Sequence, residues 1–332
     1  FKEFIGWNEE PKYNIRGDHV MDKLKTFPQK KLPNKEQRHR LFGSVEPAPG
    51  TKPVDKHEMA DLQNTKEDFL FDLDAVGITN VKHPITLEST LAPKEQTTVA
   101  VFTLTSGLKQ TNKGTNMSRF TELLTAYSQN GFRVDIKTLK NFTETLADRL
   151  EQDDTTVEIS FPWFFHQSSP TSGLTGMNHA DVSIMVSYDR VHGYSITASL
   201  SALITTLCPC SKEISEYSAH NQRGKITMEI DLDDAFDETK ADWKEKLLEA
   251  AESNASAKLY PVLKRPDEKM VTETAYENPR FVEDMVRLVA ADLYELSFVR
   301  KFKVSCRNEE SIHMHDAIAS VTFNKENSNR EM

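Results

Sequence analysis

The chain has 332 residues, of which 38% are hydrophobic and 28% are charged, and its formal net charge is −10. Such a composition is typical of a folded globular protein with one large domain or two medium ones, and it excludes a disordered chain. No apolar run approaches the roughly 20 residues of a membrane-spanning helix, and the acidic balance argues against sequence-independent nucleic-acid binding, so we expect neither a membrane nor a nucleic acid as partner.

Residues 1–40 differ from the rest of the chain. They are rich in Lys, Asn, Pro and Glu and show no sustained hydrophobic period, so we expect a mobile N-terminal extension. Docking of this extension on a partner subunit is the alternative. The first ten residues, FKEFIGWNEE, lack the apolar stretch of a secretory signal, which favours a cytoplasmic location.

The first half of the remaining chain shows two kinds of hydrophobic period. Period-two alternation indicates strands, and apolar residues at helical spacing indicate helices. The segments are strands around residues 99–104, 157–161 and 182–186, and helices around residues 120–127 and 139–150.

The second half repeats this order of patterns. The segments are strands around residues 194–202, 226–230 and 317–323, and helices around residues 243–251 and 285–296. Before the last of these helices, Asn278 is a suitable N-cap and Pro279 suits the first helical position.

The order of elements predicts an α+β fold. The chain is interpreted as strand-strand-helix-helix-strand-strand, twice, in which each antiparallel sheet must cover one face with helices. We therefore expect a first unit over residues 41–190 and a second over residues 191–326, with most of the chemistry-bearing residues in the second.

The segment Cys208-Pro209-Cys210 indicates metal binding or catalysis. Two cysteines one residue apart rarely form a disulfide with each other, because the ring would be strained. The chain has three cysteines, and an odd number in a reducing compartment favours a metal site or a catalytic thiol. The spacing from Cys208 to His220 is wide enough for both side chains to bind one Zn²⁺ or similar ion.

Each candidate also has a purely structural interpretation. Cys306 alternates with apolar residues and is best interpreted as a small buried hydrophobe. His313 and His315 can be surface residues, and Glu283 can pair with Arg287 on a helix surface. The basic residues Lys264, Arg265 and Lys269 can form a solvated patch.

Three long segments resemble the signature segments of one known family, GTP cyclohydrolase type IB. They are LCPCSKEISEYSAHNQRG, LKRPDEKMVTETAYENPRFVED and CRNEESIHMHDA, and the resemblance extends from about Phe42 to Phe323. The resemblance implies a tunnelling fold with two ββααββ units per chain, assembled as a homotetramer with active sites at subunit interfaces. It implies conversion of GTP and water into 7,8-dihydroneopterin triphosphate and formate, the first step of tetrahydrofolate synthesis, with Zn or Mn as the metal.

The resemblance also implies roles for individual residues. Cys208, His220 and Glu268 match metal ligands. Cys210, Glu310 and His313 match positions near the reacting atom, where His313, helped by Glu310, is the candidate acid. Glu283 matches the carboxylate that holds guanine, because it stands in a Pro-x-x-x-Glu segment that begins at Pro279. The candidates for triphosphate binding are Lys212, Arg223, Lys264, Arg265 and Lys269.

Other functions remain open at this point. A cyclohydrolase of the archaeal type would form a cyclic phosphate, and a nitrile-reducing oxidoreductase of the same fold would use a cysteine nucleophile and NADPH. A non-catalytic, zinc-stabilised assembly module would bind metal without turnover. Type IA cyclohydrolases are disfavoured, because their zinc pattern has a Cys-x-x-His segment and a later His-x-Cys, whereas this chain has Cys208-x-Cys210 and His313-x-His315.

Overall fold

The computed structural model describes residues 31–129 and 131–328 in two compact units. The first unit ends at Ala60 and the second begins at Asp61. In the first unit, helix α1 (Lys35–Leu41) begins at Asn34, whose side chain accepts the N–H of Gln37, and the helix buries none of its residues. The expected mobile extension, residues 1–40, falls mostly on residues 1–30, which lie outside the described residues.

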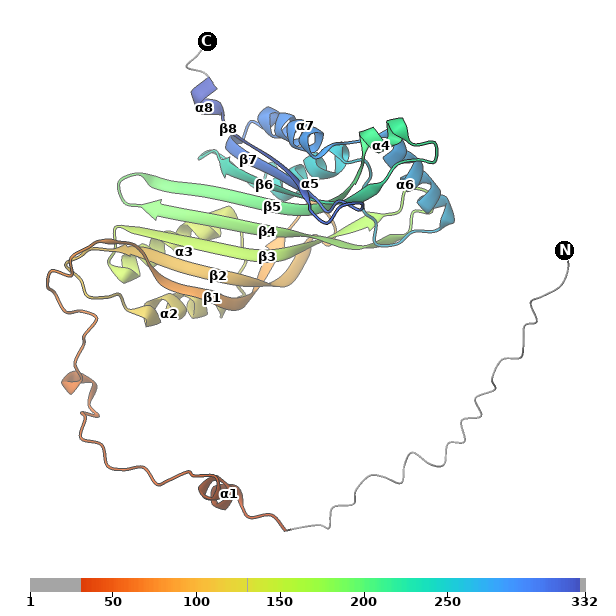
Figure 1. Cartoon of the computed structure of the whole chain (residues 1–332). Helices are drawn as coiled ribbons and strands as arrows, with labels where there is room; N and C mark the ends of the chain where they lie inside the picture. Colours follow the sequence, from red (N-terminus) through yellow and green to blue (C-terminus); the bar gives the residue numbers. More distant parts are fainter. Residues whose placement is uncertain (1–30, 130, 329–332) are drawn as a thin grey trace. The chain divides into compact units, whose positions relative to one another are not determined.

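The second unit is built on one antiparallel sheet of eight strands (Figure 1). Neighbours in the sheet are also neighbours in the sequence, so each strand pairs with the next one along the chain. The strands are β1 (Leu73–Glu88), β2 (Glu95–Leu108), β3 (Asp154–Ser168), β4 (Thr175–Asp189), β5 (Gly193–Leu207), β6 (Asn221–Leu232), β7 (Val299–Asn308) and β8 (Ala317–Asn324). This arrangement confirms the predicted α+β class and the antiparallel pairing.

Helices connect the strands in both halves of the sheet. They are α2 (Met117–Ser128) and α3 (Ile136–Leu150) in the first half, and α4 (Pro209–Ile214), α5 (Trp243–Asn254), α6 (Arg265–Glu277) and α7 (Val282–Glu295) in the second. Helix α8 (Lys325–Ser328) follows β8, and the 3-10 turn η2 (Lys56–Glu58) belongs to the first unit. The predicted strands and helices are all present. The second half differs from the first, because α4 lies between β5 and β6 and three helices lie between β6 and β7.

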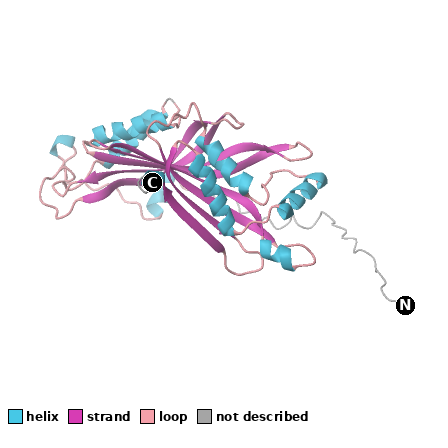
Figure 2. Ribbon diagram, turned by 90° about the horizontal axis from the view of Figure 1, so that it is seen from above, coloured by secondary structure: helices cyan, strands magenta, loops and turns pink. Residues whose placement is uncertain are grey.

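One hydrophobic core joins the sheet to its helices. Along β3, alternate residues from Val157 to Phe165 are buried, as expected for a strand with one covered face. Helix α3 places Leu139, Phe142 and Leu146 on its buried side, and these belong to the same core as the strand residues. Figures 1 and 2 show the longer helices lying along the sheet. No described helix is long and apolar enough to cross a membrane.

The predicted start of the last long helix is wrong. Asn278 ends α6 instead, and its backbone and side-chain N–H groups both bond to the carbonyl of Thr274. Helix α7 begins at Val282, where the carboxylate of Asp284 accepts the N–H of Phe281. Asn278-Pro279 therefore separates two helices, because a proline shortly after a helix end prevents its continuation.

Candidate active site

Cys208 and His220 lie side by side where β5 ends and β6 begins. Leu207 and Asn221 are directly opposite each other in the last pair of this ladder. One residue further, the backbone N–H of Cys208 donates to the carbonyl of His220 at 3.1 Å. The strand pairing therefore brings together a thiol and an imidazole, although eleven residues separate them in the sequence.

Ser211 links Cys208 and His220 a second time. Its N–H points at the sulfur of Cys208 at 3.5 Å, and its hydroxyl donates to the Cys208 carbonyl at 3.2 Å. The same hydroxyl oxygen accepts the backbone N–H of His220 at 3.2 Å. Cys208 and His220 are half-buried, whereas Cys210 is exposed. The short helix α4 thus holds Cys208 against the strand end and leaves Cys210 at the surface.

The loop between β7 and β8 reaches the same place. The N–H of Glu309 donates to the carbonyl of Arg223 at 2.9 Å, so the loop begins beside β6. Within the loop, the N–H of His313 bonds to the carbonyl of Glu310 at 3.4 Å. The hydroxyl of Ser311 lies 3.5 Å from Nδ1 of His220. The structure therefore brings Glu310 and His313 into the neighbourhood of Cys208 and His220.

His313 and His315 are neighbours within this loop. Their rings are stacked, with centroids 4.8 Å apart, and both side chains are exposed. Both lie in the turn before β8, which begins at Ala317.

Helix α6 turns one face toward the end of β5. Val271 and Ala275 pack with Leu207 and Ala219, the residues that precede Cys208 and His220. Glu268 stands one turn before Val271 on the same face of the helix, because residues three and seven apart share a face. Its side chain is exposed. Among the described residues of one chain, no three His, Cys, Asp or Glu side chains gather closely enough to hold a metal ion.

Asp267 is a buried carboxylate that the sequence did not single out. It accepts the N–H groups of Thr171, Ser172 and Lys264 and the hydroxyl of Ser172, at 2.7 to 2.8 Å. Burial alone would raise the pKa of Asp267, but these hydrogen bonds hold it far below its usual value. Asp267 therefore connects the start of α6 to the β3–β4 hairpin and positions the basic residues beside it.

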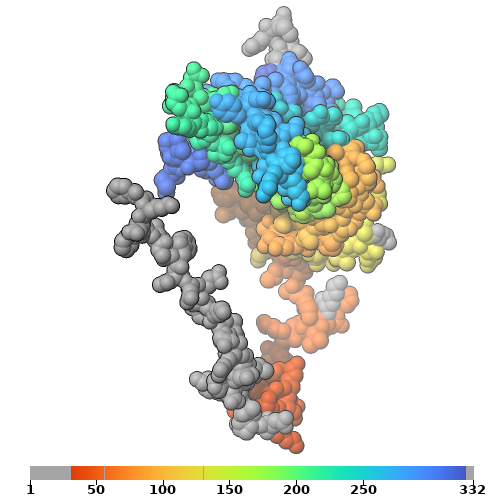
Figure 3. All heavy atoms as spheres, turned by 90° about the vertical axis from the view of Figure 1, so that its right-hand side faces the viewer, coloured from red at the N-terminus to blue at the C-terminus, as the bar shows by residue number. Residues whose placement is uncertain are grey.

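The basic candidates are spread over the edge of this region. Arg223, Lys264, Arg265 and Lys269 are exposed, and the ammonium of Lys269 pairs with Glu273 on the surface of α6. Lys212 donates to the carbonyl of Tyr276 at 2.6 Å and lies 4.4 Å from the centre of its ring. Figure 3 shows the surface on which α4 and α6 lie next to each other.

Glu283 lies in the first turn of α7 and is exposed. The segment before it is tied to the site, because the N–H of Arg280 donates to the carbonyl of Leu207 at 2.9 Å. Arg287, the alternative partner of Glu283, lies 3.7 Å from Asp284 instead. Cys306 is buried as expected, and burial raises the pKa of its thiol to about 12.

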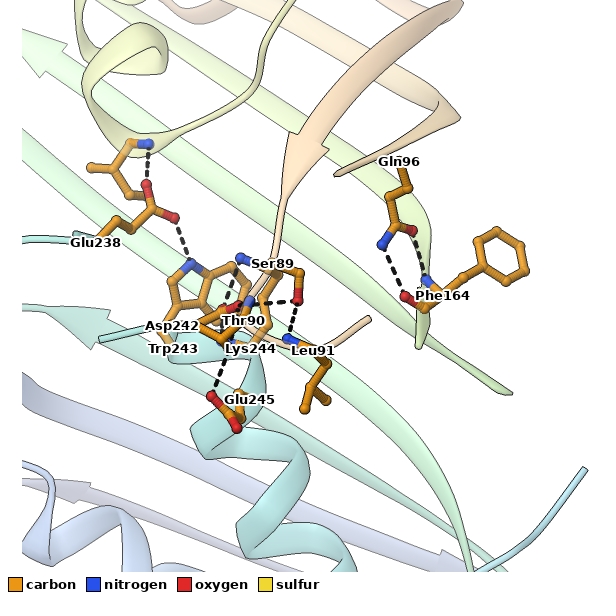
Figure 4. A network of polar contacts seen from close by, with 11 residues as sticks. Ser89, Thr90, Leu91, Gln96, Phe164, Glu238, Asp242, Trp243, Lys244 and Glu245 are labelled. Atoms are coloured by element: carbon orange, nitrogen blue, oxygen red, sulfur yellow. Dashed lines mark hydrogen bonds and ion pairs between the residues drawn. The ribbon is translucent and has the colours of Figure 1, made fainter. Parts of the chain in front are cut away.

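A second group of charged residues lies at a cavity of about 690 Å³. Its walls come from the β1–β2 hairpin, the start of α3 and the segment before α5. The sequence analysis missed this group, in which Asp242 and Lys244 form an ion pair and Glu238 accepts the N–H of Ile136 (Figure 4). All three side chains are charged, and local pattern predicts charged side chains at the surface. No signal in the sequence therefore indicates that they are buried.

Comparison with known proteins gives one family. A family model described as type I GTP cyclohydrolase folE2 matches residues 59–319. A protein named GTP cyclohydrolase FolE2 from Oceanobacillus iheyensis is 67% identical over 299 residues, which are 90% of this chain and 99% of that protein. Proteins of the same name from Halalkalibacterium halodurans and Bacillus subtilis are 58% and 55% identical to this chain. Each match covers 89% of this chain, together with 99% of the Halalkalibacterium halodurans protein and 97% of the Bacillus subtilis protein. Among solved structures, a uricase from Arthrobacter globiformis is similar over 76% of this chain and 94% of its own, with a TM-score of 0.46 and 10% identity.

Proposed function

Because this chain belongs to the type I GTP cyclohydrolase FolE2 family and is a GTP cyclohydrolase, we propose that it converts GTP and water into 7,8-dihydroneopterin triphosphate and formate with the help of a divalent metal ion. The product would make this reaction the first step of tetrahydrofolate synthesis. The observation that supports the proposal is the meeting of Cys208, His220 and the Glu310–His313 loop at one strand end, beside the segment that leads to Glu283.

The donor set at this strand end fits zinc or manganese. Cys208 offers a thiolate and His220 an imidazole nitrogen, and Glu268 offers a carboxylate from the helix face that packs on the same strand end. These three residues would hold the ion once the exposed side chain of Glu268 turned toward Cys208 and His220, since no three such donors converge among the described residues of one chain. When bound, such an ion acts as a Lewis acid that makes water a nucleophile near neutral pH.

Glu283 would select guanine. A guanine ring presents two adjacent donors, N1–H and the exocyclic amine, and one carboxylate can accept both. A base without this pair of donors would leave the carboxylate without partners, at a cost of about 1–3 kcal/mol or more. The position of Glu283, three residues after the bond from Arg280 to Leu207, supports this role.

The basic residues would hold the triphosphate. Arg223 stands directly beside the site on β6, while Lys264, Arg265 and Lys269 stand at the start of α6. Arginine can bind a phosphate through two parallel N–H groups, and lysine provides a point charge. Lys212 is already held by Tyr276, which makes it the least available of the candidates.

His313 and Glu310 would move the protons of the reaction. Carbon 8 of the purine becomes electrophilic when the adjacent ring nitrogen, N7, is protonated, and His313 would donate this proton. Glu310 lies three residues earlier in the same loop and would assist the histidine. Cys210 is exposed beside Cys208 and would serve as a further proton carrier during reclosure of the ring.

The fold and the assembly are part of the same proposal. We propose that the sheet consists of two ββααββ units of a tunnelling fold, over residues 41–190 and 191–326, and that four chains assemble with active sites at their interfaces. The exposure of Glu268, Glu283 and His313 in a single chain supports this assembly, because a partner subunit could cover them. A cytoplasmic location is proposed as well.

Pterin fluorescence tests the proposal. Purified chain is incubated with GTP after chelation, with and without added Zn²⁺ or Mn²⁺, and the product is identified by mass. We expect a fluorescent pterin triphosphate only with metal. A cyclic phosphate product would support the archaeal-type reaction instead, and bound metal without turnover would support the assembly module.

Cys208→Ala and His220→Ala then test the ligand assignment. Each should lower the metal content of the purified protein, and a full metal complement in both would refute their role as ligands. Cys306→Ala is the matched control for Cys208, because Cys306 is a thiol buried in the hydrophobic core.

A further inference from the structure

His220 is held by a buried side-chain network that the proposed reaction does not use. Nδ1 of His220 lies 3.0 Å from Oε1 of Gln222, and Nε2 of Gln222 donates to the hydroxyl oxygen of Thr206 at 3.0 Å. Gln222 is 7% exposed and Thr206 is fully buried. The network therefore extends from the half-buried imidazole to a side chain that is wholly inside the protein.

The strand register creates this network. Thr206 on β5 and Gln222 on β6 are directly opposite each other in the antiparallel ladder. Side chains directly opposite in such a ladder are within hydrogen-bonding reach. His220 stands two residues before Gln222, so its side chain points to the same face of the strand. One pair in the ladder thus sets the position of an amide, and the amide faces the imidazole ring.

We propose that Gln222 is a positioning residue that keeps the proton of His220 on Nδ1 and so presents the lone pair of Nε2 to the site. With its Nε2 donating to Thr206, the amide of Gln222 turns its oxygen toward His220, and an oxygen can only accept. The neutral imidazole must then carry its hydrogen on Nδ1. The second contact of the ring, from Ser311, is also made at Nδ1, at 3.5 Å.

This inference rests on the proposed metal site and deepens it. Histidines that bind metal ions usually donate their other ring N–H to a neighbouring acceptor, which sets the ring orientation and the tautomer. Loss of such an acceptor typically costs about 10- to 100-fold in metal affinity. Gln222 would fill this place for His220, with Thr206 orienting the amide.

Four variants separate positioning from general stability. Gln222→Leu removes the acceptor at similar size, and Gln222→Glu restores an acceptor that cannot donate when ionised. Thr206→Val removes the hydroxyl that orients the amide. Thr205→Val is the matched control, because Thr205 is the neighbour of Thr206 in the strand and points to the other face of the sheet.

Zinc affinity is measured by competition with a chromophoric chelator, and the thermal midpoint of each variant confirms folding. We expect Gln222→Leu to bind Zn²⁺ about 10- to 100-fold more weakly, Gln222→Glu to bind as the wild type does, and Thr206→Val to show a smaller loss. Thr205→Val should be unchanged. Wild-type affinity in folded Gln222→Leu, or a failure of Gln222→Glu to restore binding, would overturn the proposal.

The tautomer is measured independently of metal. Heteronuclear NMR of the histidine ring nitrogens, on metal-free protein with His220→Asn to assign the signal, distinguishes Nδ1–H from Nε2–H in the neutral ring. We expect Nδ1–H in the wild type and in Gln222→Glu, and a mixture in Gln222→Leu. Nε2–H in the wild type would refute the positioning role, whereas absence of zinc binding with Nδ1–H intact would refute the metal site alone.

Discussion

Asp242 and Lys244 form an ion pair of 2.8 Å in which both side chains are more than nine-tenths buried. The carboxylate also accepts the N–H and the hydroxyl of Thr90, more than 150 residues earlier in the chain (Figure 4). The pair therefore connects the first helix after β6 to the β1–β2 hairpin. The connection matters because the two halves of the sheet come from different parts of the sequence.

Asp242→Ala should destabilise the fold strongly. Removal of one partner leaves the ammonium of Lys244 buried without its counter-charge, which costs about 3–5 kcal/mol. Lys240→Ala, which breaks an exposed pair with Asp237, should change the free energy of unfolding by about 0–1 kcal/mol. Urea unfolding measures both. Equal stability of the two variants would show that the buried pair contributes no more than the exposed one.

Glu238→Gln should change the pH dependence of stability. Burial is the largest influence on Glu238 and raises its pKa, although the N–H of Ile136, Lys244 and Trp243 oppose this rise. A carboxyl group whose pKa is raised in the folded state contributes stability at pH values below its pKa in the unfolded chain, which is near 4.5. This contribution is lost as the pH rises through the pKa that the group has in the folded state.

The free energy of unfolding of Glu238→Gln and wild type is therefore compared from about pH 4 to pH 8. The variant should be relatively more stable at the upper end of this range than at the lower end. Asp242→Asn should show the opposite sign in a more acidic range, below about pH 3.8, where the wild type loses the stability that ionised Asp242 contributes. Burial raises the pKa of Asp242, but the pairing with Lys244 and the hydrogen bonds outweigh burial and lower it. A pH-independent difference for Glu238→Gln would contradict the raised pKa.

Asp267→Ala should loosen the start of α6. Three backbone N–H groups and one hydroxyl would lose their acceptor in a buried place, and each unsatisfied buried group costs about 1–3 kcal/mol. Hydrogen exchange should rise in residues 169–174 and in the first turn of α6. Glu273→Ala on the exposed face of the same helix is the control, and comparable exchange in both variants would argue against the anchoring role of Asp267.

Glu283→Ala should abolish GTP turnover and leave the metal content unchanged. The carboxylate is proposed to accept both donors of guanine, whereas the metal ligands lie on other elements. Glu295→Ala, at the other end of α7, is the matched control and should retain full activity. Pterin fluorescence with GTP and metal analysis give the two readouts. Loss of metal in Glu283→Ala would show that Glu283 acts on the metal rather than on the purine.

Hydrophobic period was sufficient to predict most of the fold. In β3, alternate residues from Val157 to Phe165 are buried, and in α3 the buried residues Leu139, Phe142 and Leu146 follow helical spacing, as predicted. The face of a strand or helix that packs in the core must be apolar, so the period of the element is visible in the sequence. Helix α6 was missed as an element. Only Asp267 and Ala275 are buried on it, so it has almost no apolar stripe to detect.

The candidate site was predictable in part. Cys208 and His220 could be paired because the loop between them joins two consecutive strands, and antiparallel neighbours bring such loop ends together. Gln222, Asp267 and Asp242 could not be identified in this way. Each gains its role from a partner that lies far along the chain, on a neighbouring strand or hairpin, and local pattern contains no information about such contacts.

The pairing of β4 with β5 has a consequence for how the chain can be divided. These strands are joined by a tight connection in which Asp189 accepts the N–H groups of Val191 and His192, and the side chain of Val191 is exposed. A protease cut or an engineered break at Val191 would leave two fragments, each with four strands and a bare edge that matches the other. Since Asp242 and Glu238 add further matching contacts between the fragments, co-expressed pieces would be expected to recombine into one sheet.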